Sequence, residues 1–536
     1  MTIGEKICCL RTAAELSQEE LAEKLSVSRQ SVSKWEMDQA LPQLDKILPL
    51  CRLFHISADT LLQPEAALPR PGHKTPGGRY FGTDGFRGEA NVALTAEHAY
   101  RVGRFLGWYY AAPLSGCDRP GRRPRIVIGK DTRRSGYMLE YSIAAGITAS
   151  GADAYMLHVT TTASVSYATR QEDFDCGVMI TASHNPFSDN GIKLISRFGE
   201  KLDHKTTEYI EDYLDGDLHA LGLTCDLPLA TGERIGRIVD HVAGRNRYVG
   251  YLISLASHSY KNLRIGLDCA NGAAWMMARS VFAALGAQIH VTGDTPDGLN
   301  INENCGSTHI GQLCRLVKEQ HLDVGFAFDG DCDRCIAVDH TGAVVDGDKI
   351  LYLLARRLQN CGMLRGDTVV ATVMSNSGLI RSLAEAGIRC VLTDVGDRFV
   401  YEKMQACDYS LGGEQSGHII MKKYATTGDG LLTAIMIAEE ICGSKRSLQE
   451  LTAQAVMYPQ CTRSIQVHDK EAALRDPLLA EEAAKIEALL DGRGRVLLRK
   501  SGTEPVVRIM VESEKNCEDY ADRLAAVLAE GGHTLD

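Results

Sequence analysis

Short apolar runs alternate with amphipathic stretches along most of the chain beyond residue 79. The apolar runs lie at 125–129, 177–181, 263–268, 324–328 and 368–373, and amphipathic stretches lie at 136–150, 275–285 and 377–386. Consecutive apolar positions are typical of a strand that is buried on both faces, and strands that alternate with helices form parallel sheets. The pattern therefore predicts layered α/β domains.

The two ends of the chain follow other patterns. RVLLR at 495–499, a short loop, VVRIMVE at 506–512 and a final helical stretch predict a small α+β domain. Residues 1–62 have helical spacing throughout and no strand pattern. Residues 63–78, QPEAALPRPGHKTPGG, hold four prolines and three glycines, which predicts an extended linker.

Length and composition limit the class of protein. A chain of 536 residues is too long for one core. No apolar stretch approaches the ~20 residues that cross a bilayer, and charged residues occupy the N-terminus where a signal peptide would be apolar. We therefore expect a cytoplasmic protein without a membrane segment, whose 17 cysteines are reduced. The net charge of −11 argues against a general polyanion binder, but it leaves room for local phosphate sites.

Three aspartates, Asp329, Asp331 and Asp333, follow the apolar run VGFAF within five residues. Two carboxylates about 5 Å apart repel by roughly 3 kcal/mol at an effective dielectric near 20, so three together need a cation among them or must partly neutralise. Oxygen ligands favour a hard ion, and Mg²⁺ is the one we expect. The alternative is an acidic turn at the end of a strand.

A second motif, TASHNPFSDNGIK at 181–193, follows the apolar run GVMI. Ser183 would lie just past the carboxyl end of a strand, where open α/β sheets bind their ligands. It could be a nucleophile, with Lys193 as a charge partner or proton carrier. Asn-Pro and Asn-Gly also signal turns, so a plain polar turn is the alternative.

Two further motifs carry polar groups suited to a phosphorylated sugar. RKSGTEPVVR at 499–508 offers two arginine forks, two hydroxyls and a glycine whose backbone can turn inward, a set that matches phosphate. LGGEQSGH at 411–418 places three polar side chains on a glycine-rich segment suited to sugar hydroxyls. The first set is Arg499, Ser501, Gly502, Thr503 and Arg508, and the second is Glu414, Ser416 and His418. A hairpin connection and an ordinary polar loop are the respective alternatives.

From about Arg79 to the C-terminus, the motifs resemble those of the α-D-phosphohexomutases, and among these the members that act on glucosamine phosphates. FGTDGFRG, TASHNPFSDNGIK, INENCGSTH, DGDCDR, GEQSGH, TTGDG and RKSGTEP occur in the family's order. The resemblance implies three mixed α/β domains and a C-terminal α+β domain around one cleft. The expected boundaries are 79–235, 236–342, 343–455 and 456–536.

The resemblance also implies a reaction and roles for individual residues. Ser183 would be phosphorylated, and one Mg²⁺ would bridge its phosphate to the three aspartates. Arg87 would face the phosphoserine, and Lys193 and His418 would move protons. Glucosamine 6-phosphate and glucosamine 1-phosphate would interconvert through glucosamine 1,6-bisphosphate, which also activates the enzyme, although glucose and mannose phosphates remain alternatives.

Two positions depart from the family's pattern. Cys332 stands where the metal loop has glycine, and Lys500 stands where the phosphate loop has proline. A positive φ at Cys332 would cost on the order of 1 kcal/mol, and we expect its sulfur to lie close to the metal site, where it would sensitise the protein to Zn²⁺. Neither change removes a ligand.

Residues 17–36, SQEELAEKLSVSRQSVSKWE, resemble a lambda-repressor-like helix-turn-helix. Ser17 and Glu20 form a capping box, and Ser28 can cap the second helix. The outward positions, where such modules contact the major groove of DNA, are Arg29, Gln30, Ser31, Ser33 and Lys34. Seven basic against nine acidic residues in 1–62 favour DNA only weakly, so a helical bundle for protein contact and a sugar-phosphate-sensing regulator remain alternatives.

Overall fold

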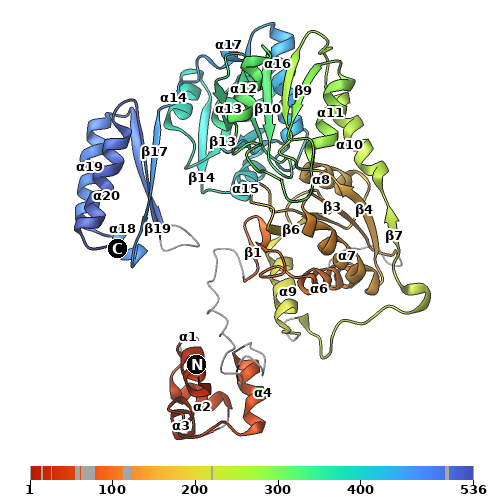
Figure 1. Cartoon of the computed structure of the whole chain (residues 1–536), viewed down its shortest axis with the longest axis vertical. Coiled ribbons are helices and arrows are strands. Elements are labelled where there is room, and N and C mark those ends of the chain that lie inside the picture. The colour runs from red at the N-terminus through yellow and green to blue at the C-terminus, as the bar shows by residue number, and fades with distance from the viewer. Residues whose placement is uncertain are drawn as a thin grey trace. The chain divides into compact units, whose positions relative to one another are not determined.

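The chain forms two units, Met1–Arg79 and Tyr80–Asp536, in a computed structural model (Figure 1). The structure describes residues 2–13, 16–25, 27–54, 61, 79–112, 122–218, 221–500 and 506–534. The predicted linker at 63–78 lies outside these residues. Within the described residues, no helix has both the length and the apolar character needed to cross a membrane.

The N-terminal unit is helical, as its spacing predicts. Its helices are α1 (Ile3–Ala13), α2 (Gln18–Leu25), α3 (Arg29–Glu36) and α4 (Leu44–Leu53). The capping box is present, since Ser17 N–H donates to Glu20 and Glu20 N–H donates to the Ser17 hydroxyl. Ser28 caps α3, and the buried side chains of Val32 and Trp35 hold α3 in the core of the unit.

Domain I of the second unit has a mixed sheet in the order β1-β2-β6-β5-β3-β4-β7. Its strands are β1 (Phe81–Gly82), β2 (Gly85–Glu89), β3 (Arg125–Lys130), β4 (Asp153–Val159), β5 (Cys176–Ile180), β6 (Asp189–Ser196) and β7 (Ile238–Asp240). Its helices are α6 (Ala96–Tyr109), α7 (Arg134–Ala149), α8 (Thr162–Gln171) and α9 (His204–Asp215). Because β7 pairs in parallel with β4, domain I extends beyond the expected boundary at residue 235.

Domains II and III are layered α/β domains with mixed sheets in the orders β12-β11-β10-β8-β9 and β14-β13-β15-β16. Domain II comprises α10 (Val242–Ser254), β8 (Arg264–Asp268), α11 (Ala274–Ala284), β9 (Gln288–Thr292), α12 (Gly311–Glu319), β10 (Val324–Phe328), β11 (Cys335–Asp339) and β12 (Val344–Val345). Domain III comprises α13 (Gly347–Asn360), β13 (Thr368–Thr372), α14 (Ser377–Glu385), β14 (Arg389–Thr393), α15 (Asp397–Cys407), β15 (Leu411–Gly413), β16 (Ile419–Met421), α16 (Gly430–Ser444) and α17 (Leu448–Thr452).

Domains II and III share one hydrophobic core. Helix α16 of domain III packs against β11 and α10 of domain II, and α13 packs against β11 and β12. Buried side chains from both domains, such as Phe326 and Ile435, belong to one contiguous cluster. Domain I and domain IV have clusters of their own, and Ala163 of α8 in domain I also contacts the shared cluster.

Domain IV is a small α+β domain, as predicted. Its sheet has the order β17-β19-β18, and α19 and α20 cover one face of it (Figure 1). Its elements are β17 (Gln460–Gln466), α18 (Lys470–Leu474), α19 (Pro477–Leu490), β18 (Gly494–Lys500), β19 (Val506–Ser513) and α20 (Cys517–Glu530).

The apolar runs read from the sequence are confirmed as strands β3, β5, β8, β10 and β13. The predicted parallel pairing holds for β3 with β4 and β5, for β8 with β9 and β10, and for β13 with β14 and β15. In each of these three sheets, one strand of the parallel part also pairs with an antiparallel strand. These antiparallel pairs are β5–β6, β10–β11 and β15–β16. The connections within these antiparallel pairs carry the predicted site residues.

Candidate active site

Four strand connections, one from each domain, carry the polar residues that the sequence singles out. Ser183 lies between β5 and β6, and the three aspartates lie between β10 and β11. The segment 414–418 joins β15 to β16, and the two arginines of the phosphate motif lie on β18 and β19. Each of these connections joins two antiparallel neighbours, so each site residue is anchored by a strand on both sides.

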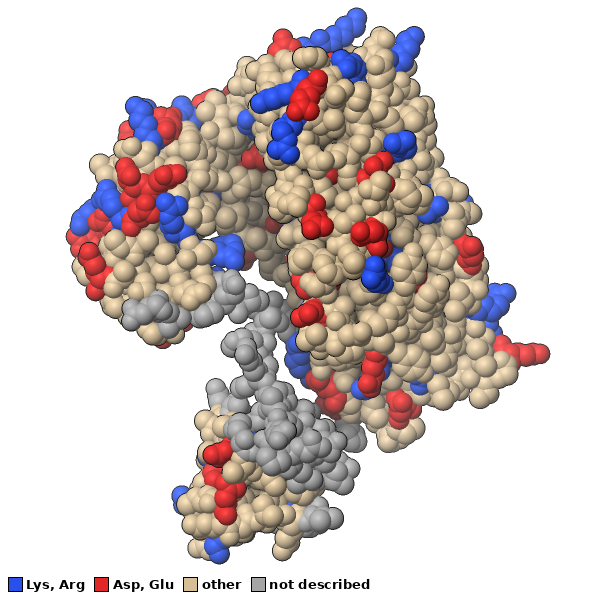
Figure 2. All heavy atoms as spheres, viewed as in Figure 1, with Lys and Arg blue, Asp and Glu red and all other residues tan. Residues whose placement is uncertain are grey.

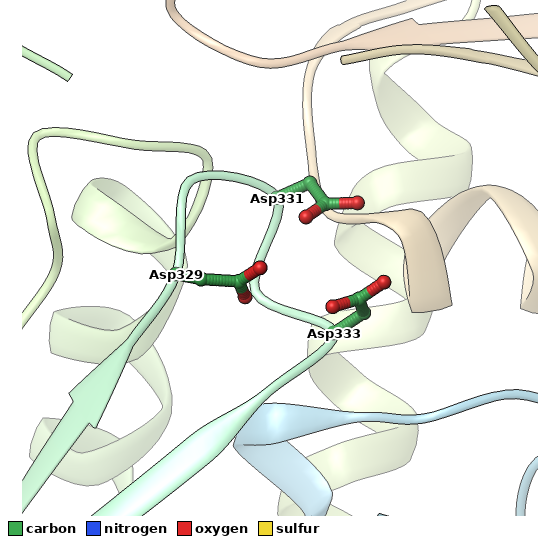
Figure 3. Close-up of side chains that lie close together, drawn as sticks. All are labelled: Asp329, Asp331 and Asp333. Carbon is green, nitrogen blue, oxygen red and sulfur yellow. The ribbon is translucent and has the colours of Figure 1, made fainter. Parts of the chain in front are cut away.

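The three carboxylates of Asp329, Asp331 and Asp333 point toward one another from the β10–β11 turn (Figure 3). One oxygen of each lies within 4.8 Å of the others, and all three side chains are buried. Burial, and then the charges of Asp333 and Asp331, raise the pKa of Asp329 well above its usual value. Among the described residues, Asp331 Oδ1 and Asp333 Oδ1 are buried without a hydrogen-bond partner. Two orphaned carboxylate oxygens beside a third carboxylate fit a hard divalent cation.

Lys193 supplies part of the missing positive charge. Its Nζ lies 2.6 Å from Asp331 Oδ2 and 2.9 Å from Asp333 Oδ2. Burial alone would lower the pKa of this amine, but the two carboxylates outweigh burial and raise it above its ordinary value. Arg334 is a second positive charge at this place, with its Nε 3.9 Å from Asp333 Oδ1. Two cations beside three carboxylates still leave negative charge over, which a divalent cation would neutralise.

Ser183 is 1% exposed, and its Oγ donates a hydrogen bond to Asp329 Oδ2. Its φ of 52° lies in the left-handed region, where a residue with a Cβ costs on the order of 1 kcal/mol. The predicted nucleophile from domain I therefore meets the predicted metal loop from domain II. Thr162 of domain I also contacts this loop, since its N–H and hydroxyl both donate to Asp331.

Two arginines lie close to the residue after the serine. Arg87, on β2, ion-pairs weakly with Asp84 at 3.6 Å. Burial, and then the charges of Arg334 and Arg87, lower the pKa of His184 to about 4. Both guanidinium groups therefore act on the Ser183 loop, which suits a phosphate carried there. Arg87 lies where the sequence predicts it. Arg334 and His184 stand inside the motifs DGDCDR and TASHNPFSDNGIK, but their residue types alone assign them no role at the Ser183 loop.

His418 lies between two kinds of hydrogen-bonding group. Its Nε2 accepts a hydrogen bond from Gly428 N–H at 3.0 Å, which requires a free lone pair and leaves the ring proton on Nδ1, the atom that faces Asp333 at 3.7 Å. Burial disfavours a second proton on the ring. The negative charges of Asp333, Asp397 and Glu414 outweigh this effect of burial and raise the pKa of His418 to about 9. A cation bound by the aspartates would offset part of this negative charge and favour the neutral His418 ring. His418 can therefore exchange a proton at Nε2.

Glu414 and Ser416 lie on the same turn as His418. Burial raises the pKa of Glu414, whose carboxylate accepts a hydrogen bond from Gly396 N–H. Ser416 Oγ is buried without a hydrogen-bond partner among the described residues. An unpaired buried hydroxyl and a carboxylate on one turn fit the hydroxyl groups of a sugar.

Arg499 and Arg508 are directly opposed on β18 and β19. Burial and then the charge of Arg508 lower the pKa of Arg499, so the two cations repel at this place. An anion between them would relieve the repulsion, as the phosphate prediction requires. Ser501, Gly502 and Thr503 lie outside the described residues. Lys500, the departure from the family's pattern, forms an exposed ion pair with Glu471 of α18.

Cys332 has the positive φ that the sequence predicts, at 58°. The side chain packs into the core shared by domains II and III and is not part of the carboxylate cluster, although the charge of Asp329 still acts on the thiol. Burial, and then the charge of Asp429, raise the pKa of this thiol well above its usual value. Cys332 is therefore a small, neutral filler of the core.

Two more polar side chains contact the Ser183 loop and were missed. Arg133, just after β3, and Asn302, in the motif INENCGSTH, both donate to the Ser183 carbonyl. A sequence signal exists for each, since Arg133 follows the carboxyl end of a central parallel strand and Asn302 belongs to a quoted motif. Neither signal indicates which atoms these side chains reach.

The residues predicted to contact DNA lie on α3 of the N-terminal unit. Arg29, Gln30 and Lys34 are exposed, whereas Ser31 and Ser33 are half-buried. The Ser31 hydroxyl lies 2.9 Å from that of Ser28, so it is partly engaged within the helix cap.

Four domains of one family match the second unit in order, under the name phosphoglucomutase/phosphomannomutase. Alpha/beta/alpha domain I matches residues 78–219, domain II matches 246–342, domain III matches 346–458 and the C-terminal domain matches 464–529. A helix-turn-helix family matches residues 10–61.

Curated relatives and solved structures resemble the same part of the chain. Phosphoglucosamine mutase of Lachnospira eligens is 55% identical over 463 residues, which are 85% of this chain and 100% of that protein. Phosphoglucosamine mutase of Lachnoclostridium phytofermentans is 54% identical over 458 residues, 85% of this chain and 99% of that protein. The fold is shared with a phosphoglucomutase/phosphomannomutase family protein from Burkholderia thailandensis (TM-score 0.68, 23% identity, 85% of this chain and 98% of that one). It is also shared with N-acetylphosphoglucosamine mutase of Aspergillus fumigatus in complex with GlcNAc-6P and magnesium (TM-score 0.57, 19% identity, 85% and 95%).

Proposed function

The chain belongs to the phosphoglucosamine mutases of the phosphoglucomutase/phosphomannomutase family, and we propose that it interconverts glucosamine 6-phosphate and glucosamine 1-phosphate through a phosphorylated Ser183. The observation that carries the proposal is the meeting of Ser183 Oγ with Asp329 in a buried carboxylate cluster, which brings a nucleophile and a cation site from two domains together. The reaction is an intramolecular phosphoryl transfer, an isomerisation.

The chemistry balances over two transfers. In the first, the bond between phosphorus and Ser183 Oγ breaks while phosphorus bonds to O1 of glucosamine 6-phosphate, the O1 proton leaves to a base, and Ser183 Oγ takes up a proton. The 1,6-bisphosphate then turns end over end. In the second, the bond between phosphorus and O6 breaks while phosphorus bonds to Ser183 Oγ, whose proton leaves to a base. O6 takes up a proton, and glucosamine 1-phosphate is left. The bisphosphate also loads an unphosphorylated Ser183, which makes it the activating intermediate.

Mg²⁺ is the cation that we propose for the cluster, one per active site. The three aspartates would hold it through oxygen only, together with a phosphate oxygen once Ser183 is phosphorylated. Two of the carboxylate oxygens lack partners among the described residues. When bound, the ion draws negative charge from the phosphoryl group during transfer.

The proton carriers follow from their surroundings. Lys193 is held as an ammonium by two carboxylates, so it serves as a positive charge rather than as a base. A cation bound by the same carboxylates would lower the proton affinity of Lys193 and let it act as a proton donor. His418 has a lone pair on Nε2 in its neutral form and can accept the proton of a sugar hydroxyl. Arg87 balances the charge of the phosphoserine.

The sugar is held at its hydroxyls and at its free phosphate. Glu414 and Ser416 are the proposed hydroxyl contacts. The phosphate contacts are Arg499, Ser501, Gly502, Thr503 and Arg508. Because the sugar reverses between the two transfers, this set must hold a phosphate on either end, and paired arginine forks tolerate both orientations.

A coupled assay on three hexose phosphates tests the proposal. The protein should turn over glucosamine 6-phosphate with a higher kcat/KM than glucose 6-phosphate or mannose 6-phosphate, and intact-mass measurement should find one phosphate, located on Ser183. Equal or faster turnover of mannose 6-phosphate would assign the chain another substrate. A fully active protein without phosphate on Ser183 at any stage would overturn the mechanism.

DNA contact through the N-terminal unit is a second proposed function. Helix α3 exposes Arg29, Gln30 and Lys34. Its acidic residue, Glu36, is engaged by Arg11 at 2.5 Å and by Gln18 at 2.7 Å, so it does not offset these cations. A helix with a basic outer face and a capped N-terminus fits the major groove.

Binding of random and selected duplexes at several salt concentrations tests this second function. Arg29→Ala and Lys34→Ala should each weaken binding and reduce its salt dependence. The exposed acidic residue Glu23 of α2 offers a control, since Glu23→Ala should leave binding intact or strengthen it. A protein that binds no duplex, while remaining an active mutase, would favour protein contact. An inactive mutase that binds DNA in a sugar-phosphate-dependent way would favour a sensor.

A further inference from the structure

The carbonyl group of Ser183 accepts hydrogen bonds from side chains of two domains. Ser183 is in the left-handed region at φ 52°, a conformation that L residues with a side chain adopt only when their surroundings enforce it. The carbonyl groups of Ser183 and Asn185 turn toward the protein interior, and both accept hydrogen bonds from the same two side chains, Arg133 and Asn302. These side chains are therefore candidates for what enforces the conformation.

Arg133, in domain I, is fully buried. Its Nη2 donates to Ser183 O at 2.9 Å and to Asn185 O at 2.8 Å. Its Nη1 donates to Asp189 O at 3.0 Å and to Pro186 O, and its Nε donates to Asp131 at 2.9 Å. Each of the five N–H groups of this guanidinium thus has an acceptor, and four of the acceptors are carbonyl groups of the loop between β5 and β6. A lysine, with three donors on one atom, could not span them.

Asn302 reaches the same carbonyl groups from domain II. Its Nδ2 donates to Ser183 O at 2.9 Å and to Asn185 O at 3.0 Å, and its side chain is 6% exposed. The metal loop closes the third side, because a Cβ at Gly330 would lie 2.5 Å from Ser183 O. The Ser183 carbonyl is thus surrounded by domain I, by Asn302 and by the turn that carries the aspartates.

Another chain of hydrogen bonds holds the opposite side of the residue. Ser183 N–H donates to Thr181 Oγ1 at 2.9 Å, and the Thr181 hydroxyl donates to Asp131 Oδ2 at 2.7 Å. Asp131 in turn accepts from the Arg133 guanidinium. Arg133 therefore acts on Ser183 directly through the carbonyl and indirectly through Asp131 and Thr181.

We propose that Arg133 and Asn302 are positioning residues that fix the Ser183 backbone so that Oγ keeps one place opposite the aspartates, and that Asn302 makes this place depend on domain II. The inference rests on the proposed function, in which the same Oγ must donate phosphate to O1 and accept it from O6. A loop free to rotate about φ would bring Oγ to the aspartates only part of the time. The sugar itself touches neither residue in this scheme.

Asn302→Ala is the informative variant, and the chain provides a matched control. Asn304 lies two residues away, has a similar left-handed φ (54° against 59°), and is exposed. Asn304→Ala thus carries the same backbone cost without loss of the hydrogen bonds to the Ser183 and Asn185 carbonyl groups. Arg133→Lys is a second variant, which retains charge opposite Asp131 but loses the fork.

Steady-state kinetics with glucosamine 6-phosphate, together with the phosphate content of Ser183 by intact mass, form the test. Asn302→Ala should lower kcat 10- to 100-fold with KM changed by less than threefold, while Asn304→Ala stays within twofold of the native protein. Arg133→Lys, if it folds by circular dichroism, should lower kcat at least as much. The phosphorylated fraction after loading with bisphosphate should stay near that of the native protein, since loading has time to reach completion.

Two results would overturn the inference. One is a kcat for Asn302→Ala within twofold of that for Asn304→Ala, and the other is a change confined to KM, which would place Asn302 in substrate binding. Failure of the proposed function has a different signature, namely a native protein that does not turn over glucosamine 6-phosphate or an active Ser183→Ala variant.

Discussion

Asp348→Asn should stabilise the protein in alkaline solution. Asp348 lies in the first turn of α13 and is fully buried. One carboxylate oxygen accepts a hydrogen bond from Asn376 N–H at 2.7 Å, and the other has no partner among the described residues. Burial, and then the charge of Asp346, raise the pKa of Asp348 to about 7. The carboxylate form is therefore disfavoured in the folded protein, and an uncharged amide of the same shape avoids that cost.

The sign and size follow from the two pKa values. A carboxyl with a folded pKa near 7 and an ordinary unfolded value binds more protons when folded, so its contribution to stability is fully present below pH ~4 and is lost as the pH rises to about 7. The difference corresponds to about 4 kcal/mol at 1.36 kcal/mol per pH unit. The amide group of the asparagine is buried and needs a hydrogen-bond acceptor, which offsets part of this gain. We expect a net gain of about 2 kcal/mol at pH 8.5.

Urea unfolding at pH 5 and pH 8.5 measures the effect. Trp275 packs against the core shared by domains II and III, so its fluorescence reports this region when Trp35 and Trp108 are changed to Phe. Asp348→Asn should raise the unfolding free energy at pH 8.5 by about 2 kcal/mol more than at pH 5. Asp394→Asn, an exposed carboxyl of the same domain, serves as control. A gain that is equal at both pH values, or larger at pH 5, would refute the reasoning.

Three other outcomes are expected. Ser183→Ala should abolish turnover while glucosamine 6-phosphate still binds, as measured by calorimetry; retained activity would remove Ser183 from the mechanism. Glucosamine 6-phosphate should exceed glucose 6-phosphate and mannose 6-phosphate at least tenfold in kcat/KM, about 1.4 kcal/mol of discrimination, in the coupled assay. Cys332→Gly should leave inhibition by Zn²⁺ unchanged, because the thiol is buried and neutral. The same variant should change the free energy of unfolding by less than about 1 kcal/mol, since relief of the left-handed backbone offsets lost packing. A variant less sensitive to Zn²⁺ would place the sulfur at the metal site.

Local sequence patterns were enough to predict most of the strands and the central residues of the site. The strands β3, β5, β8, β10 and β13 are short apolar runs whose burial on both faces is visible in sequence. Asp329, Asp331 and Asp333 are close in sequence, so their proximity in space needs little tertiary information. Ser183 was found because it follows a buried strand.

Tertiary arrangement decided what the sequence left open. Arg133 and Asn302 are separated by more than 160 residues, and only the docking of two domains shows that they reach one carbonyl group. The sequence does not show on which side of its turn the Cys332 side chain lies, and the structure places it in the core that domains II and III share. Strand β7 joins the sheet of domain I from beyond the expected boundary because its partner is β4, far away in sequence.

The core that domains II and III share determines which parts of the cleft can move independently. The aspartate turn and the turn that carries Glu414 and His418 both rise from strands anchored in that one core. A chain cut between residues 342 and 346 would strip α16 from β11 and leave both fragments with large apolar faces in water, so neither is expected to fold alone. The cation site and the sugar hydroxyl site thus move together as one rigid body. Hydrogen bonds from Thr162 and Asn302 also tie domain I to domain II, so the room that a reversing sugar needs is expected to come from domain IV.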